Sequence, residues 1–318
     1  MGSVKDLIVK QKASPTKFGL GVFKFTDDYS VFDYGKMPDR IPGKGEALCR
    51  MAAFNFEELA KKRVKSHFRK LLSGNEMEVN LVQVLYPQKN ELKETSSNYL
   101  VPLEIIFRNS LPRGSSVFKR LEKGEITPED LGLSEIPKAG EKLSKPLIDV
   151  STKLEKSDRY LDWSEAQKIS CLSDKELNEL KEKTSLINDF ITEKAESVGL
   201  IHADGKVEFG MNPERELILV DVCGTLDENR MLFNSVNVSK QVLRDYYFTT
   251  PWAKEFETAK QELPEEKWPK PPLLPKELID IVGNMYKSVT VAWCEKEFWK
   301  ETPSIEEVVH SYKEVLGK

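Results

Sequence analysis

The sequence predicts an α+β fold built from two closely joined lobes. Its first hundred residues alternate short strand-like runs with one long helix, and a capped amphipathic helix starts after residue 173. That second helix leads directly into a hairpin of two charged strands. Because the strands and helices do not alternate in a regular order, an α+β fold is favoured over a doubly wound sheet.

The composition is that of a globular protein with a substantial core. The chain has 318 residues, of which 39% are hydrophobic and 31% are charged, and its net charge is −4. A nearly balanced charge argues against nucleic acid as a partner, so any basic site must be local. The four cysteines are far apart in the sequence, which argues against a zinc module and for reduced thiols in a cytosol.

Membrane and export signals are not expected in this sequence. No apolar run approaches the ~20 residues that a membrane-spanning helix needs. The charged first residues lack the apolar centre of a signal peptide. We therefore expect a cytoplasmic protein without a membrane partner.

The N-terminal lobe is expected to span residues 1–105. Short apolar runs predict strands over 18–25, 79–86 and 99–107, and apolar spacing predicts a helix over 46–72. The later segment 122–146 is rich in Glu, Lys, Pro and Gly without apolar periodicity. We expect it to be a connecting or inserted segment on the surface.

The second lobe is expected to span residues 106–293. Ser173 to Glu176 forms a capping box, and apolar residues at helical spacing continue as far as Gly199. The hairpin is followed by a basic segment (239–247), a Pro-rich charged link (262–275) and a helix (276–293). Residues 294–318 form a charged tail, which we interpret as a packing or assembly surface.

The charged hairpin carries the strongest chemical signal. Asp204, Lys206 and Glu208 occupy every second position, so in a strand they share one face, while mostly apolar residues occupy the other. A short turn leads to a second strand, 217–222, which places Asp221 near Lys206 and Glu208 within one residue of register. Two carboxylates beside a lysine suggest Mg²⁺ and phosphate, because Mg²⁺ takes oxygen ligands. The alternative is an amphipathic ribbon whose charged face is solvated.

Two loops have the composition of anion-binding sites. Residues 28–45 collect charge, glycine and proline before a helix, where backbone amides and Lys44 could hold an anion. Residues 108–116 combine two arginines, a glycine and serine hydroxyls, which suits a phosphate monoester. The alternatives are an ordinary helix cap and a surface loop with ion pairs. Positive residues of 227–230 and 240–244 add to the second signal, although alone they would be helix-surface residues.

Six blocks, read in order, resemble the SAICAR synthetase family, the phosphoribosylaminoimidazole-succinocarboxamide synthases of purine biosynthesis. The resemblance extends from Gly2 to about Trp293, and the order of the blocks makes it specific. The blocks are Gly2-Ser-Val-Lys-Asp-Leu7, similar to the family's opening loop of glycine and lysine, Phe25-Thr-Asp-Asp-Tyr-Ser-Val-Phe-Asp33, Ile41-Pro-Gly-Lys-Gly45, Pro102-Leu-Glu-Ile-Ile-Phe-Arg-Asn109 with Gly114-Ser115, Asp204-x-Lys-x-Glu-Phe-Gly210 and Ser239-Lys-Gln-Val-Leu-Arg-Asp245.

The resemblance implies a two-lobed, ATP-grasp-like fold with ATP between the lobes. It also implies an ATP-dependent ligase that joins carboxyaminoimidazole ribonucleotide (CAIR) and L-aspartate to form SAICAR, ADP and phosphate, with Mg²⁺ as cofactor. Phosphorylation of the imidazole carboxylate supplies a leaving group that the aspartate amine can displace. Such an enzyme must neutralise phosphates, exclude water and align three reactants.

The resemblance also assigns expected roles to individual residues. The expected catalytic residues are Asp158, Asp204, Lys44 and Lys206. The expected ATP-binding residues are Val4, Lys5, Leu100, Val101, Leu103 and Lys206. The expected substrate-binding residues are Asp39, Lys44, Gly45, Arg108, Gly114, Ser115, Arg230, Lys240 and Arg244. The expected metal ligands are Glu208 and Asp221.

Two other functions stay open at this point. An ATP-dependent kinase acting on a small molecule would use the same phosphate chemistry but only a hydroxyl acceptor. A non-catalytic nucleotide-binding relative is suggested by Ser3, Ser157 and Val222, where the family commonly has a lysine, a histidine and an acidic residue. The C-terminal helix offers a surface for a homodimer.

Overall fold

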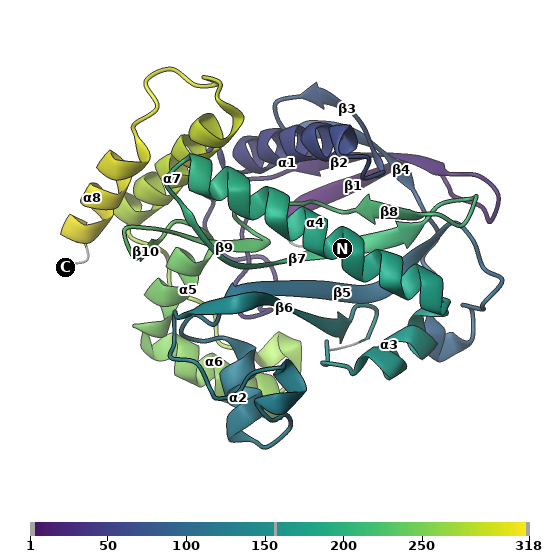
Figure 1. Cartoon of the computed structure of the whole chain (residues 1–318). Coiled ribbons are helices and arrows are strands. Elements are labelled where there is room, and N and C mark those ends of the chain that lie inside the picture. Colours follow the sequence, from purple (N-terminus) through teal and green to yellow (C-terminus); the bar gives the residue numbers. More distant parts are fainter. Residues whose placement is uncertain (1–3, 156–157, 316–318) are drawn as a thin grey trace.

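Two antiparallel sheets form the framework of the protein (Figure 1). The computed structural model describes residues 4–155 and 158–315, so Ser3 and Ser157 lie outside the described residues. The first sheet contains, in spatial order, β1 (Lys5–Gln11), β2 (Gly19–Phe25), β4 (Glu76–Leu81) and β3 (Phe68–Ser73). The second contains β10 (Val236–Asn237), β9 (Asn229–Phe233), β7 (Ile201–Met211), β5 (Tyr99–Ser110) and β6 (Lys142–Thr152), with β8 (Leu217–Val220) paired to β7.

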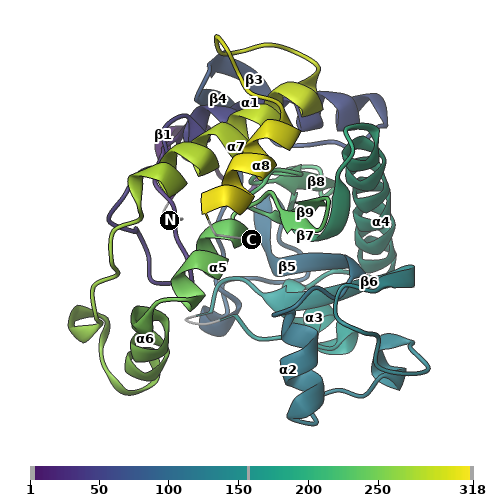
Figure 2. The ribbon, with the colours of Figure 1, turned by 90° about the vertical axis from the view of Figure 1, so that its left-hand side faces the viewer.

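Helices lie on both sides of the second sheet, with α4 on one side and α5 on the other (Figure 2). The helices are α1 (Lys44–Lys61), α2 (Ser116–Glu122), α3 (Trp163–Ser170), α4 (Asp174–Ser197), α5 (Gln241–Phe248), α6 (Pro251–Glu262), α7 (Lys276–Cys294) and α8 (Ile305–Val315). Single 3-10 turns occur at Pro87–Lys89, Glu129–Leu131 and Glu265–Lys267. Within the described residues, no helix is long and apolar enough to cross a membrane.

The long helix α4 determines which face of the second sheet is left for the charged residues. Its N-terminus is the expected capping box, in which Ser173 and Glu176 exchange side-chain to backbone hydrogen bonds. Its buried stripe includes Leu180, Ile187 and Ile191. Asn109 of β5 donates to Asn188 Oδ1 of α4 at 3.0 Å, so α4 covers the face of β5 that carries Asn109. Alternation along the strand therefore turns Glu104 and Arg108 to the opposite face.

One continuous hydrophobic core joins the two sheets. Phe23 and Val79 from the first sheet belong to the same buried cluster as Phe107 and Phe209 from the second. The boundary expected between the lobes at residue 105 falls within β5, which pairs with both β6 and β7. The N-terminal and C-terminal halves of the chain are therefore joined by a continuous strand, β5, and by one hydrophobic core.

The α+β class, the β2 strand, the capped helix, the hairpin and the helix α7 are confirmed. The helix expected over 46–72 ends at Lys61, because Arg63 adopts a left-handed backbone (φ 64°) and β3 begins at Phe68. Phe68 still stacks on Phe56 of the helix, so the apolar spacing continued although the helix did not. The strand expected over 79–86 ends at Leu81, where its partner β2 begins at Gly19.

Other segments gain structure that the sequence pattern did not predict. The opening segment, expected as a loop, forms β1 from Lys5 because it pairs with β2. The surface segment expected over 122–146 already contains the start of β6. α6 was also not predicted. The charged tail contains α8, whose Val308, Val309 and Tyr312 are buried against the rest of the chain.

Candidate active site

Matched positions on β5 and β7 divide one face of the second sheet into two charged regions. Glu104 and Arg108 lie four residues apart on β5, and their partners across the strand pair are Glu208 and Asp204 of β7. Asp204 and Glu208 are each 5% exposed. The charged face of the hairpin is therefore buried, which rules out the solvated ribbon.

The neighbouring strand β6 repeats the same spacing. Asp149 of β6 lies opposite Ile106 of β5, and Lys153 follows directly after the end of β6. β5 and β6, with the residue after β6, therefore each supply one residue to each region, four positions apart, and β7 supplies Asp204 to one region and Lys206 and Glu208 to the other. We define the arginine cluster as Arg108, Arg120, Asp149, Asp204, Arg230 and Arg244. We define the lysine cluster as Lys5, Glu104, Lys153, Lys206, Glu208 and Asp221.

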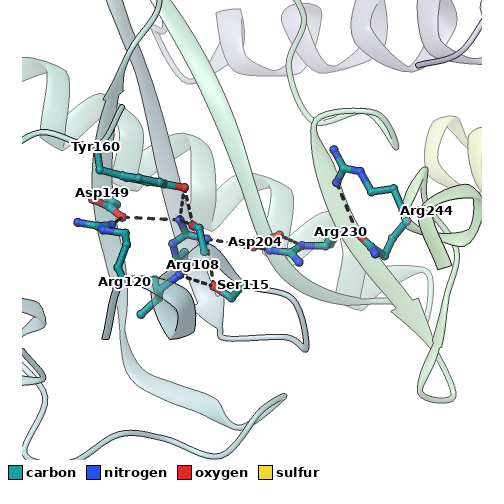
Figure 3. A network of polar contacts seen from close by, with 11 residues as sticks. Arg108, Ser115, Arg120, Asp149, Tyr160, Asp204, Arg230 and Arg244 are labelled. Atoms are coloured by element: carbon teal, nitrogen blue, oxygen red, sulfur yellow. Dashed lines mark hydrogen bonds and ion pairs between the residues drawn. The ribbon is translucent and has the colours of Figure 1, made fainter. Parts of the chain in front are cut away.

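The arginine cluster forms a row of ion pairs (Figure 3). Arg120 Nη1 donates to Asp149 Oδ2 at 2.6 Å, and Arg230 Nε donates to Asp204 Oδ1 at 2.8 Å. Arg108 lies between these two pairs, with its guanidinium 3.6 Å from Asp149 Oδ2 and 3.5 Å from Asp204 Oδ2. Arg108 is 3% exposed, so its charge is held in a low-dielectric environment.

Arg244 of α5 completes the arginine cluster without a carboxylate partner among the described residues. Its Nη1 contacts Gln241 Oε1 at 3.4 Å. Burial and the neighbouring charge of Arg230 lower the pKa of Arg244. The cluster has four guanidinium groups against two carboxylates, which leaves an excess of two positive charges. That excess, together with forked donors, suits a phosphate dianion.

In the lysine cluster, ammonium groups alternate with carboxylates. Lys206 Nζ lies 2.7 Å from Glu104 Oε1, and Lys153 Nζ lies 3.1 Å from the same oxygen. Lys153 also reaches Glu208 Oε1 at 2.6 Å. The hairpin register sets Glu208 opposite Val220, next to Asp221, as expected. Asp221 pairs with Lys5 at 2.8 Å rather than with Lys206, so β1 of the first sheet contributes to this cluster.

The two carboxylates Glu208 and Asp221 have unequal affinities for protons. Burial, and then the charge of Asp221, raise the pKa of Glu208 to about 7. Burial also opposes ionisation of Asp221, but the ammonium of Lys5 outweighs it and lowers the pKa of Asp221. Because the charge of Asp221 still disfavours ionisation of Glu208, a divalent cation beside both carboxylates would stabilise both ionised forms.

The position of Asp221 is fixed by its backbone. Asp221 has a left-handed conformation (φ 64°), which ends β8 and turns its side chain toward Lys5. Its carbonyl oxygen lies 3.0 Å from His67 Nε2. Burial lowers the pKa of His67 to about 4, so this histidine is neutral near pH 7.

Among the described residues, no group of three or more His, Cys, Asp or Glu side chains could hold a metal ion. Two carboxylates suffice for Mg²⁺ when substrate phosphates supply other oxygens.

Lys44 differs from the sequence-based expectation of a substrate contact. Its side chain is 0% exposed, and its Nζ lies 2.8 Å from Asp227 Oδ2. Tyr286 also donates to Asp227, at 2.6 Å, and Lys240 lies 3.9 Å from it. Lys44 is therefore a structural partner of Asp227, because a buried carboxylate needs a nearby cation.

The helix start at Gly45 also differs from the expected anion site. The amide of Gly45 donates to Asp27 Oδ1 at 3.0 Å, and the amide of Lys44 donates to the carbonyl of Ile41, so neither is free for an anion. Asp39 accepts the amide of Leu274 at 2.8 Å, which gives it a structural contact rather than an open carboxylate.

The loop after β5 places its hydroxyls beside Arg108. Gly114 adopts φ 80°, which favours glycine, and leads into α2. Ser115 caps α2 by accepting the amide of Val117, and its Oγ lies 3.5 Å from Arg108 Nη1. Ser115 thus belongs to the arginine cluster's immediate surroundings, as expected from sequence.

Only part of the strand that was expected to line an adenine slot is accessible. Val101 and Leu103 are fully buried in the core, so their side chains cannot line an open slot, whereas Leu100 is partly exposed. The carbonyl of Val4 is occupied by Thr26. The side chain of Asp158 is largely exposed, and its partial desolvation, followed by the charge of Glu104, raises the pKa of its carboxyl group. Asp158 therefore lies within electrostatic reach of the lysine cluster.

Sequence reasoning missed several residues of both clusters. Glu104 was missed although it lies four residues before the predicted Arg108 in one strand, so the signal of a shared strand face was present in the sequence. Asp149 lies in β6 and Lys153 directly follows it; the start of this strand was expected to be surface loop, so the spacing of the two residues was not considered. Arg120 carried no recognisable signal, because its role depends on a partner 29 positions away.

Known proteins resemble this chain in sequence and in fold. A family model described as SAICAR synthetase matches residues 12–259. A chain of Archaeoglobus fulgidus, described provisionally as a phosphoribosylaminoimidazole-succinocarboxamide synthase, is 44% identical over 99% of this chain and 100% of its own length. The SAICAR synthase of Saccharomyces cerevisiae complexed with SAICAR has a TM-score of 0.68 at 20% identity, over 94% of this chain and 95% of that one. A SAICAR synthetase (Type-2) in complex with ADP has a TM-score of 0.60 at 21% identity, over 86% of this chain and 99% of that one.

Proposed function

This chain belongs to the SAICAR synthetase family, and we propose how its two clusters divide the work of the family's reaction. The protein is an ATP-dependent ligase that joins CAIR and L-aspartate to form SAICAR, ADP and phosphate in purine biosynthesis. In this proposal, the arginine cluster binds the phosphate of the ribonucleotide and the lysine cluster binds the phosphates of ATP.

One observation carries the proposal. Arg108 and Asp204 of one cluster lie on the same face of β5 and β7 as Glu104 and Glu208 of the other, four residues apart, which corresponds to ~13 Å along a strand. That spacing is on the scale of a ribonucleotide, so a substrate phosphate at one end would leave the imidazole carboxylate near the other. Activation of that carboxylate requires it to meet the terminal phosphate of ATP there.

The arginine cluster supplies fixed positive charge for the ribonucleotide phosphate. Arg108, Arg230 and Arg244 are the groups whose guanidinium N–H donors we assign to this phosphate, with the hydroxyl of Ser115 beside them. Asp204 holds Arg108 and Arg230 together. Guanidinium forks held by carboxylates are oriented before the substrate binds, which reduces the ordering cost of binding.

The lysine cluster supplies exchangeable charge for ATP. Lys5, Lys153 and Lys206 now neutralise carboxylates, and we infer that they transfer to phosphate oxygens when ATP binds. Glu208 and Asp221 fit Mg²⁺ and would hold it as oxygen ligands. When bound, Mg²⁺ would neutralise phosphate charge and align the terminal phosphoryl group.

The chemical step follows from these positions. The imidazole carboxylate attacks the terminal phosphorus of ATP, and the bond from that phosphorus to ADP breaks, which forms an acyl phosphate and ADP. The aspartate amine then attacks the acyl carbon, loses a proton and displaces phosphate. Lys206 would stabilise charge on the transferred phosphoryl group, and we assign Asp158 to the imidazole side of the lysine cluster.

The first test is a substrate-omission assay. Phosphate release from MgATP is measured with purified protein, CAIR and L-aspartate, each omitted in turn, while the succinocarboxamide product is identified by mass. Product that requires all three substrates supports the ligase assignment. A phosphorylated product that forms without aspartate would instead indicate the kinase, and no turnover would favour a non-catalytic relative.

Two further expectations stay predictions. A cytoplasmic location is expected from the reaction and from the reduced cysteines, none of which forms a disulfide in the described residues. A homodimer is also expected, although the apolar residues of α8 pack on their own chain. Sedimentation analysis of the purified protein would test the second expectation directly.

A further inference from the structure

Arg108 is oriented by two neutral hydroxyls that lie outside the family blocks. Its Nη2 donates to Ser116 Oγ at 3.1 Å and to the hydroxyl of Tyr160 at 3.2 Å. Those two hydroxyls lie 2.5 Å apart and share a hydrogen bond. Arg108 Nε is buried and has no hydrogen-bond partner among the described residues. The hydroxyl pair therefore fixes one edge of the guanidinium and leaves part of its donor capacity unused.

Tyr160 is itself held from two directions. Its backbone forms a bridge with Ser151 of β6, which anchors the residue beside the second sheet. The guanidinium of Arg120 lies over its ring, 4.1 Å from the centroid. Contact of a guanidinium with a ring face is favourable, so the ring also holds Arg120 in place (Figure 3).

Arg120 in turn pairs with Asp149, whose carboxylate could otherwise compete with a substrate phosphate for Arg108. Asp149 Oδ2 lies 2.6 Å from Arg120 Nη1 but 3.6 Å from Arg108 Nη2. If Asp149 were free, it would form a close ion pair with Arg108 and neutralise the charge that a phosphate needs. A neutral hydroxyl accepts a hydrogen bond without cancelling that charge.

We propose that Tyr160 is a positioning residue for substrate phosphate, acting together with Ser116 to orient Arg108 while its ring keeps Arg120 on Asp149. Tyr160 acts through Arg108, and its role is to keep that guanidinium both aligned and electrostatically available. This inference rests on the proposed function, because it assumes that the arginine cluster binds the ribonucleotide phosphate.

The test compares Tyr160→Phe with wild-type protein by calorimetric titration of CAIR without ATP. The variant keeps the ring under Arg120 and removes only the hydroxyl, so the fold should be retained. We expect ~10-fold weaker binding of CAIR, the size of one lost hydrogen bond to a charged group. Binding of the dephosphorylated nucleoside should be equal in the two proteins. In turnover, KM for CAIR should rise while KM for ATP and kcat stay within about two-fold of wild type.

Ser116→Ala provides a second variant should Tyr160→Phe fold poorly. It removes the other hydroxyl of the pair, and the double variant should lose little more than either single variant, because both changes break one unit. The matched control is Tyr312→Phe, which removes the hydroxyl of a buried tyrosine in α8, outside the arginine cluster. This variant should leave CAIR binding unchanged.

The outcomes distinguish failure of the proposed function from failure of the positioning role of Tyr160. Wild-type protein that does not bind CAIR would overturn the proposed function, and this inference with it. Wild-type binding with an unaltered Tyr160→Phe variant would overturn only the positioning role. A loss of the same size for CAIR and for its nucleoside would also overturn it, because a general structural defect does not depend on the phosphate.

Discussion

The arginine cluster and the lysine cluster share strands β5 and β7 yet differ in how they balance charge. The arginine cluster has four cations against two carboxylates, whereas the lysine cluster has three of each. Arginine presents a rigid fork, and lysine presents a compact charge on a flexible stem. The first arrangement suits a fixed anion site, and the second suits a site that exchanges partners during each turnover.

Each cluster is also supported from behind by a buried neutral histidine. His67 contacts the backbone of Asp221 in the lysine cluster. His202 lies in β7 behind the arginine cluster, with Nδ1 at 2.9 Å from Thr192 and Nε2 at 3.0 Å from Asn229. The similar support shows that the clusters differ in their functional faces rather than in how the sheet holds them.

The largest effect is expected for Glu208→Gln, which tests whether the lysine cluster, unlike the arginine cluster, exchanges its partners. If Glu208 leaves its lysine partner and binds Mg²⁺ during turnover, this variant should lose about 10³-fold in kcat, because a metal contributes several kcal/mol to the reaction. The melting temperature without ligands should stay close to that of wild type, and its rise with MgATP should be lost. Glu216→Gln, at an exposed carboxylate of the same hairpin, is the control. Near-normal turnover in Glu208→Gln would remove the metal assignment.

Acid should weaken the support of the arginine cluster. Burial lowers the pKa of His202 to about 4, below the ordinary value of 6.5 for histidine. The unfolded state therefore binds more protons than the folded state between these values, so stability falls as pH decreases from about 6.5 to about 4. The expected loss from this residue is about 3 kcal/mol. Urea unfolding of wild type and His202→Gln across this pH range would measure it, and equal slopes would contradict the buried neutral histidine.

Arg108→Lys should separate the two clusters by substrate. Lysine keeps the charge but loses the fork, so KM for CAIR should rise about 10²-fold, a loss of two charge-assisted hydrogen bonds. KM for ATP should change by less than about three-fold, because Arg108 is not in the lysine cluster. Arg69→Lys, at an exposed position of β3, is the matched control. A rise in KM for ATP as large as that for CAIR would show that the clusters do not bind separate substrates.

The smallest expected effect is that of Lys153→Gln. Two other lysines remain in the cluster, so KM for ATP should rise only about 10-fold, the value of one charged hydrogen bond. KM for CAIR should be nearly unchanged. Lys65→Gln, which breaks an exposed ion pair with Glu216, should leave both constants unaltered. If Lys153→Gln raised KM for CAIR instead, Lys153 would belong with the arginine cluster in function.

The sequence by itself determined the features that depend on near neighbours. Alternation placed Asp204, Lys206 and Glu208 on one face, and the spacing of Ser173 and Glu176 predicted the start of α4. These features follow from the fixed geometry of strands and helix ends, which one segment carries within itself. The same local logic failed after Lys61, because apolar residues on β3 continued the helical spacing of α1.

Only the tertiary structure decided which charges meet. Lys5 reaches Asp221 across 216 positions, Arg108 meets Tyr160 across 52, and Lys44 forms a buried ion pair with Asp227. Such contacts depend on the register between strands and on how two sheets pack, and neither quantity is encoded in the periodicity of one segment. The residue types that bind phosphate could therefore be predicted from the sequence. Their division into a site with fixed ion pairs and a site whose ion pairs exchange partners depends on the fold.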